Sequence, residues 1–211
     1  MNVKVCAWRD DDFEGVAGLF DALWGWELEG SEQEKRDISD LYVAGAVLEC
    51  NRLRVIRLEG RVVAFLGSIF YDNSVSGEAL YDAQSFRLAA AGMQERLGGT
   101  ALGRESIDFN DRIVKTNRAL EAQMKSRGYV WQAELKLLMT SPAFQGRGLA
   151  RALIDETLQT MRARGVKGVM LYTDTHCNWR YYEKTGWTLA AEHSWLFRDE
   201  TIRGLAYFKE L

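Results

Sequence analysis

Residues 145–151 have the composition expected of an anion-binding turn. Gln145, Gly146, Arg147 and Gly148 precede an amphipathic helix. Backbone N–H groups in the first turn of a helix have no acceptor within that helix, and the helix dipole adds positive potential there. The glycines would let a ligand approach the backbone closely, and arginines at 147 and 151 add positive charge. The segment therefore predicts a phosphate or pyrophosphate site.

Two well-known phosphate-binding loops do not match this segment. A P-loop requires Lys-Ser or Lys-Thr after its last glycine, where this chain has Leu149-Ala150. A dinucleotide-binding fingerprint requires a third glycine or an alanine at the position of Arg151, together with a preceding strand that opens a βαβ unit. The pattern that does match is Gln/Arg-x-x-Gly-x-Gly/Ala, through Gln145, Gly148 and Ala150.

The elements around this turn are predicted to form a crossover. An apolar strand is expected over 133–139, a helix follows the turn to about residue 164, and a second strand is expected over 166–173. Strands joined through one helix are parallel neighbours in most sheets. If the two strands splay apart, a cleft opens next to the start of the helix.

A second motif lies downstream, where Asn178, Tyr182, Gly186 and Trp187 have the order Asn, Tyr four residues later, then a Gly-aromatic pair. The two motifs and the order of elements resemble the GNAT superfamily of acyl-coenzyme A-dependent N-acetyltransferases. The resemblance implies an α/β fold with a mixed, mostly antiparallel sheet, a parallel pair splayed at the cofactor, and helices on both faces. We expect a single domain over 1–211, with a probable helical insertion at 78–127.

The resemblance implies that an acetyl group passes from acetyl-CoA to a primary amine of a small molecule or peptide by direct attack, without a metal. The alternative is a non-catalytic acyl-CoA-binding regulatory or partner-binding module. The acceptor stays open among aminoglycosides, polyamines, amino acids and protein amines. The residues that the resemblance assigns to the cofactor are Leu138, Met139, Thr140, Gln145, Gly146, Arg147, Gly148, Leu149, Ala150, Arg151, Asn178 and Tyr182.

Two side chains are candidates for proton transfer. Glu134, on the strand before the turn, is the candidate base, and its alternative role is an ion-paired strand glutamate next to Lys136. Tyr182 is the candidate acid for the departing thiolate, because a phenol with a pKa of about 10 is protonated at neutral pH; its alternative role is packing of the short helix. His176 and Cys177 are expected to be polar loop residues, because no Cys or His spacing matches a zinc site.

The rest of the chain is expected to complete the sheet and to line the acceptor side. A first strand is predicted over 3–8, a helix capped by the acidic run 10–12, an aromatic loop over 24–30, and a helix over 32–48. In that loop Trp24 and Trp26 are candidates for substrate binding, and plugging of a core edge is the alternative. A hairpin is expected around residues 59–60, and closing strands at 187–197 and 202–208.

The helix pair at 78–127 departs from the resemblance. It is expected to pack over the acceptor side or to form a homodimer interface.

Composition limits the remaining function classes. The 211 residues carry a net charge of −3, so no strongly basic face predicts nucleic-acid binding. Nowhere do eighteen apolar residues run together, so no membrane association is expected. Three cysteines, odd in number and far apart, favour a reducing compartment, and we expect a cytoplasmic protein.

Overall fold

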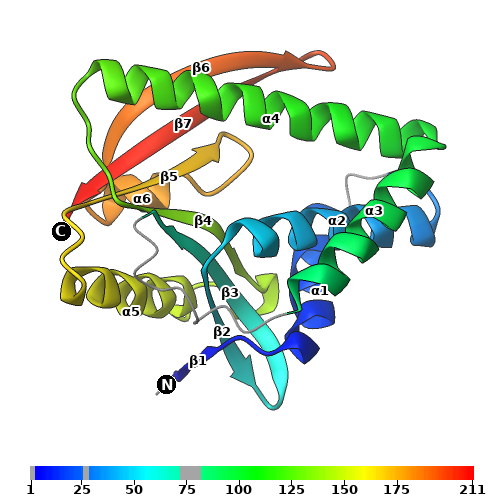
Figure 1. The fold of residues 1–211 in the computed structure, drawn as a ribbon, viewed down its shortest axis with the longest axis horizontal. Helices are drawn as coiled ribbons and strands as arrows, with labels where there is room; N and C mark the ends of the chain where they lie inside the picture. Colours follow the sequence, from blue (N-terminus) through cyan, green and yellow to red (C-terminus); the bar gives the residue numbers. More distant parts are fainter. Residues whose placement is uncertain (1–2, 26–28, 72–81) are drawn as a thin grey trace.

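The computed structural model describes residues 3–25, 29–71 and 82–211, which form one sheet surrounded by helices (Figure 1). The strands are β1 (Val5–Ala7), β2 (Arg52–Leu58), β3 (Arg61–Phe70), β4 (Ala133–Thr140), β5 (Gly168–Asp174), β6 (Thr188–Phe197) and β7 (Glu200–Glu210). The helices are α1 (Phe13–Trp24), α2 (Glu32–Glu49), α3 (Ala83–Gly98), α4 (Ala101–Ser126), α5 (Leu149–Ala163) and α6 (Arg180–Lys184), with 3-10 turns η1 (Asp10–Asp12) and η3 (Pro142–Phe144).

The sheet has the strand order β1-β2-β3-β4-β5-β7-β6. All neighbouring strands are antiparallel except β4 and β5, which are joined through α5 and run parallel. The mixed sheet with one parallel pair is therefore confirmed. The β2–β3 hairpin turns at Glu59-Gly60, where both residues have positive φ (51° and 78°), as a tight hairpin turn of this length requires.

Helices cover both faces of the sheet and divide the core into three parts. On one face, α5 packs its apolar stripe, including Leu153, Ile154 and Leu158, against β3, β4, β5 and β7. On the other face, α1 and α2 cover β2, β3 and β4. Beside them on that same face, Leu120 and Met124 of α4 pack on Met170, Ala190, Ala191 and Ala206 of β5, β6 and β7.

A β-bulge at Lys136 changes which side chains of β4 face each way. Leu135 pairs with Ser68 of β3 and Leu137 pairs with Gly67, so Lys136 is an extra residue without a partner in the ladder. Before the bulge, Ala133 and Leu135 join the α5 face; after it, Leu137 and Met139 join the α1–α2 face. Glu134 therefore points to the α1–α2–α4 face, although it lies on a strand that reads as nearly continuously apolar.

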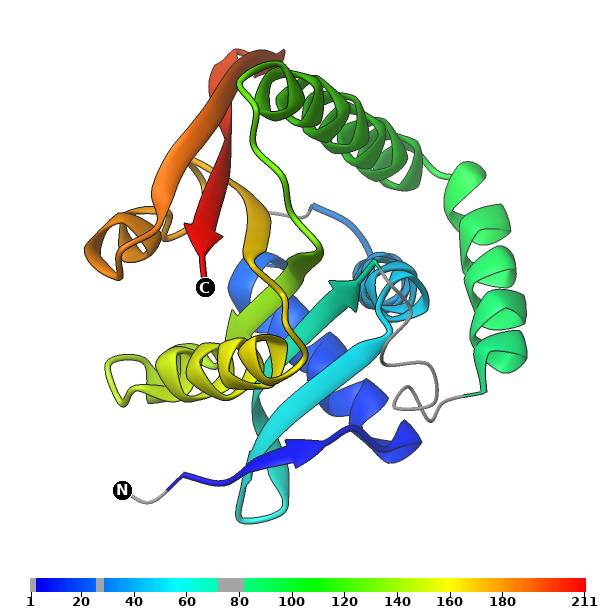
Figure 2. The same ribbon diagram turned by 60° about the vertical axis from the view of Figure 1, so that its left-hand side comes forward.

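The two helices at 83–126 lie along one side of the molecule (Figure 2). Helix α4 follows the length of β6, with Gln123 and Arg127 donating to the carbonyls of Glu192 and Ala190 at 3.1 and 2.5 Å. It approaches β7 so closely that a Cβ at Gly204 would lie 2.5 Å from the methyl carbon of Thr116. The helix pair is thus anchored at its α4 end on β6 and β7, on the face of the sheet to which Glu134 points.

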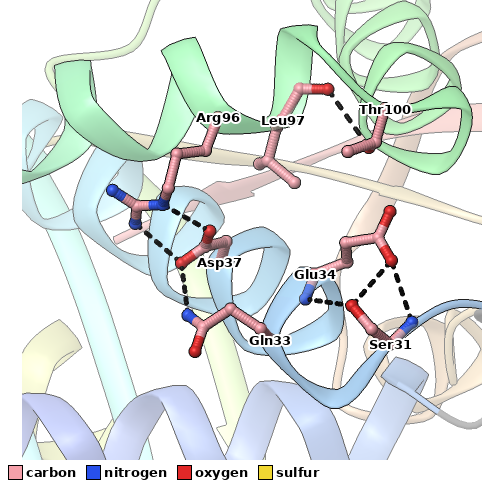
Figure 3. Close-up of a pocket in the computed structure, with 7 residues that line it drawn as sticks. All are labelled: Ser31, Gln33, Glu34, Asp37, Arg96, Leu97 and Thr100. Atoms are coloured by element: carbon pink, nitrogen blue, oxygen red, sulfur yellow. Dashed lines mark hydrogen bonds and ion pairs between the residues drawn. The ribbon is translucent and has the colours of Figure 1, made fainter.

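Helix α3 leaves the sheet and packs on α2 instead. Arg96 makes two hydrogen bonds of 2.8 Å to the carboxylate of Asp37, which also accepts from Gln33 at 3.0 Å (Figure 3). These contacts lower the pKa of Asp37, chiefly through the Arg96 hydrogen bond. The pair fastens α3 to the first half of α2.

The acidic run at 10–12 does not cap helix α1 through its side chains, contrary to the prediction. No aspartate side chain accepts from the first turn of α1. Asp12 instead accepts from the Arg9 backbone N–H at 2.7 Å within the preceding 3-10 turn and forms an ion pair with Arg57 of β2. The predicted helix cap is therefore corrected to a link between this turn and the sheet.

Candidate active site

The parallel strands β4 and β5 separate near the middle of the sheet. They pair from Ala133–Val169 to Leu135–Leu171, and the paired residues end there, although β4 continues to Thr140 and β5 to Asp174. Beyond Leu135, β4 remains paired only with β3 among the described strands, through residues that include Leu138, Met139 and Thr140. The edge of β4 that faces β5 thus has backbone groups available for a ligand.

The predicted anion-binding turn lies at the end of β4, where η3 leads into α5. Gly146 and Gly148 have φ of 76° and 78°, in the left-handed region that favours glycine, and Gly148 is the N-cap of α5. Leu149 is buried in the core, so its side chain anchors the helix start while its N–H belongs to the open first turn.

Two arginines flank that turn. Arg147 lies over the ring of Phe144, with its guanidinium carbon 5.0 Å from the ring centroid, and exposed Arg151 pairs with Asp155 at 3.6 Å. Gln145, Gly146 and Arg147 are exposed, and Ala150 is half-buried. This arrangement matches the requirements of an anion site at a helix N-terminus.

Glu134 is buried on the α1–α2–α4 face, one residue before the point where β4 and β5 separate. Its Oε2 accepts a hydrogen bond of 2.5 Å from the hydroxyl of Tyr71, and its Oε1 lies 3.9 Å from Nζ of Lys136. Lys136 in turn pairs with Glu49 of α2 at 2.5 Å. Burial raises the pKa of Glu134, and the Lys136 charge and the Tyr71 hydrogen bond oppose that rise.

Tyr182 lies on the opposite face, on the short helix α6 after β5. Its ring is 6.0 Å from Trp187, 5.7 Å from Tyr207 and 5.6 Å from Tyr181, measured between centroids. Burial raises the pKa of Tyr182, so the hydroxyl is protonated at neutral pH. The candidate acid and the candidate base thus lie on opposite faces of the sheet, with Glu134 one residue before the β4–β5 separation and Tyr182 on the helix that follows β5.

Asn178 is not the cap of α6. The N-cap is Trp179, and no side chain caps it. Asn178 is exposed in the preceding turn, where its carbonyl accepts from the N–H of Tyr181 at 3.1 Å. Gly186 follows the end of the helix, with a φ of 78° and the Trp187 N–H bonded to the carbonyl of Tyr182 at 3.0 Å.

The two tryptophans proposed for the acceptor have different outcomes. Trp24 is the last residue of α1 rather than part of a loop, and its half-buried ring packs 4.9 Å from that of Phe20. Trp26 lies outside the described residues. Both remain predictions as substrate contacts.

His176 and Cys177 show no catalytic arrangement. His176 pairs with Glu200 at 3.0 Å, and burial raises the pKa of Cys177 to about 12, which keeps its thiol protonated. Within the described residues, no group of three or more His, Cys, Asp or Glu side chains could hold a metal ion. No helix in this part of the chain is long and apolar enough to cross a bilayer.

A hollow of about 380 Å³ lies away from these groups, between α2 and α3 (Figure 3). It is lined by Ser31, Gln33, Glu34, Asp37, Arg96, Leu97 and Thr100. The polar groups in it bond to one another: Ser31 and Glu34 form a capping box, and Asp37 binds Arg96. The hollow is therefore a feature of the α2–α3 contact and not of the reactive centre.

The fold is that of the GNAT N-acetyltransferases. PH1933 from Pyrococcus horikoshii matches over 100% of this chain and 99% of its own, at 12% identity and a TM-score of 0.60. Ard1 from Thermoplasma volcanium matches over 100% and 99%, at 14% identity and a TM-score of 0.57. The ribosomal-protein-S18-alanine N-acetyltransferase of Escherichia coli matches over 99% and 93%, at 12% identity and a TM-score of 0.55.

The chain belongs to the acetyltransferase (GNAT) family, whose model matches residues 16–187. It is accordingly an acyltransferase. A mycothiol acetyltransferase from Beutenbergia cavernae is 45% identical over 64 residues, which are 29% of this chain and 21% of that protein. Because the match spans only about a fifth of that relative, it shows similarity of a segment and leaves the acceptor open.

The turn gives a first testable prediction. Gly148→Val should weaken acetyl-CoA binding about tenfold, because a β-branched residue in the left-handed region costs ~1–2 kcal/mol, which the turn would relieve by leaving its binding conformation. A Cβ at 148 would meet nothing within 4 Å, so crowding is not the cause.

Gly165→Val is the matched control for this prediction. Gly165 has a φ of 79°, equally open surroundings, and a place beyond the other end of α5. Calorimetry should show the loss for Gly148→Val and not for Gly165→Val. Equal affinities in both variants and the parent would place the phosphate site elsewhere.

Proposed function

We propose that the protein transfers an acetyl group from acetyl-CoA to a primary amine of a small molecule or peptide by direct attack. The observation that carries the proposal is that β4 and β5 separate after Leu135, with Glu134 on one face of the sheet and Tyr182 on the other, and that the glycine turn that starts α5 follows the end of β4. An acetyl group held in that separation would have a base on one side and an acid on the other.

The chain's own groups divide the work. The backbone N–H groups of residues 146–151 would bind the pyrophosphate of acetyl-CoA, with Arg147 and Arg151 nearby. The free edge of β4 from Leu138 to Thr140 would bind the amide-containing arm of acetyl-CoA, which would lie beside β4 like an added strand. Asn178, exposed beside α6, would contact the same arm.

Proton transfers would then complete the reaction. An alkylammonium has a pKa of about 10.4, so one proton passes to solvent before the amine attacks, and Glu134 would accept the second proton as the C–N bond forms. The leaving thiolate, with a pKa near that of cysteine at about 8.5, would take a proton from Tyr182. Because the Cys177 thiol stays protonated, direct transfer is favoured over an acyl-enzyme.

Helix α4 would limit which amines can react. It lies on the face to which Glu134 points and is anchored on β5, β6 and β7. The neighbouring helix α2 would then form the other side of the acceptor-binding surface. We propose that residues 1–211 form one domain with a helical insertion. A homodimer formed through the insertion is the alternative role of these helices. The three free cysteines support a location in the cytoplasm, which is a reducing compartment.

An amine panel tests the proposal. With acetyl-CoA present, at least one primary amine should raise thiol release well above the rate without acceptor, and mass spectrometry should find that amine heavier by one acetyl group. Aminoglycosides, polyamines, amino acids and peptides cover the open classes. Tight acetyl-CoA binding with no thiol release for any amine would support the non-catalytic acyl-CoA-binding alternative, which the family match does not favour.

A further inference from the structure

The candidate base is buried, and a more exposed side chain lies next to it. Glu134 is 4% exposed, whereas Tyr71, directly after β3, is 51% exposed. The hydroxyl of Tyr71 donates to Oε2 of Glu134 at 2.5 Å. An acceptor arriving from solvent would therefore meet the phenol before it met the carboxylate.

The position of Tyr71 is fixed by its backbone. The side chain of Asn51 donates to the carbonyl of Phe70 at 2.7 Å and accepts from its N–H at 2.8 Å. The N–H of Tyr71 donates to the carbonyl of Gln132 at 2.9 Å, next to the first residue of β4. The phenol is thus held against the strand that carries Glu134.

The other carboxylate oxygen is directed toward charged groups. Oε1 of Glu134 faces Lys136, which is held by Glu49 of α2. Glu121 of α4, Tyr172 of β5 and the buried Cys50 after α2 are further ionisable groups that act on this region from the elements packed around it. Oε2 and Tyr71 therefore form the route from the carboxylate to the surface.

We propose that Tyr71 contacts the acceptor amine and relays its proton to Glu134. The inference rests on the proposed function. The amine attacks as the neutral base, after its ammonium form has lost one proton to solvent. As its nitrogen bonds to the thioester carbon, one N–H proton passes to the Tyr71 oxygen while the Tyr71 proton passes to Oε2 of Glu134. The C–S bond then breaks, the thiolate takes a proton from Tyr182, and exchange with water returns the groups to their starting state.

The surroundings of the phenol suit a concerted relay. Partial burial of the phenol and the Glu134 charge raise the pKa of Tyr71, so the hydroxyl remains protonated at neutral pH and gives up its proton only as it receives another. Chains of hydrogen bonds of this kind transfer protons without creating a free phenolate. In this arrangement Tyr71 is a catalytic residue and Glu134 is the final proton acceptor.

A double-mutant cycle tests the relay. Tyr71→Phe and Glu134→Gln should each lower kcat by ~10²–10⁴-fold, the range expected for a positioned base. The double variant should lose no more than either single variant, because both interrupt one pathway. Both single variants should also lose the rise of kcat with pH that the ionisation of Glu134 produces.

Tyr172→Phe is the matched control. Tyr172 shares the electrostatic surroundings of Glu134 without a hydrogen bond to it, so this variant should keep the same pH dependence. Circular dichroism and acetyl-CoA affinity establish that each variant is folded.

Two results would overturn the relay: a kcat within about twofold of the parent for Tyr71→Phe, or losses that multiply in the double variant. An unaltered kcat for Glu134→Gln would remove the base and the relay together. Absence of thiol release from the parent enzyme with every amine would instead reject the proposed function.

Discussion

Tyr182→Phe is expected to lower kcat by ~10²–10⁴-fold, the usual contribution of a positioned general acid. The phenol lies on α6 and packs on the α5 face of the sheet, and its raised pKa keeps the proton available for the departing thiolate. The variant keeps the ring and its contacts with Trp187 and Tyr207, so acetyl-CoA affinity should change little.

The measurement separates chemistry from other steps. Single-turnover kinetics with saturating acetyl-CoA should show the loss directly, and calorimetry should show preserved affinity. Tyr181→Phe is the matched control, because Tyr181 lies on the same helix, half-buried, with its charge environment set by Asp155 and Arg151. A Tyr182→Phe enzyme with the single-turnover rate of the parent would remove the acid role.

Glu134→Gln is the second substitution for which we expect a large loss of activity. The parent should gain activity as pH rises through the elevated pKa of Glu134, because only the ionised carboxylate can accept a proton. The glutamine variant should be slower by ~10²–10⁴-fold and should lack that rise. A pH profile that matches the parent in shape and height would leave Glu134 with a structural role.

The same substitution should change how stability depends on pH. A folded-state pKa above the ordinary value of 4.5 means that the folded protein binds more protons than the unfolded chain in the range between the two values. The contribution of Glu134 is therefore most favourable at low pH and is lost as pH rises through that range. Thermal unfolding of parent and Glu134→Gln across this range should show the difference shifting in favour of the variant as pH increases.

A reverse trend in these melting curves would contradict the pKa direction without affecting the catalytic test. Lys136→Met offers a check on the cause. The Lys136 charge opposes the rise in the pKa of Glu134, so its removal should move the rise in activity to higher pH.

The parts of the fold that follow from local rules could be predicted from the sequence. Gly148 and Gly186 both have the positive φ that places a glycine at the start or end of a helix, and the parallel β4–β5 pair follows from a single-helix crossover. The Asn, Tyr and Gly-aromatic spacing likewise lies within one short segment, so its geometry depends on few distant contacts.

What could not be predicted depends on contacts between distant segments. Tyr71 and Glu134 are 63 residues apart, and nothing in the sequence near either residue indicates the hydrogen bond between them. Glu134 and Lys136, two residues apart in an apolar strand, indicate from the sequence only that one face of this strand carries charged side chains. The aromatic loop is predicted to begin at Trp24, whereas α1 includes Trp24 and has Gly25 as its C-cap.

Because of the bulge at Lys136, the two ends of β4 can be engineered separately. Residue 134 points to the α1–α2–α4 face and residues 133 and 135 to the α5 face, whereas residues 137–140 have the opposite alternation. Deleting Lys136 would restore an uninterrupted ladder and exchange, in one half of the strand, the side chains that face α5 for those that face α1 and α2. A replacement strand without this extra residue would therefore turn half of its side chains to the wrong core, so segments of β4 should be exchanged separately on either side of residue 136.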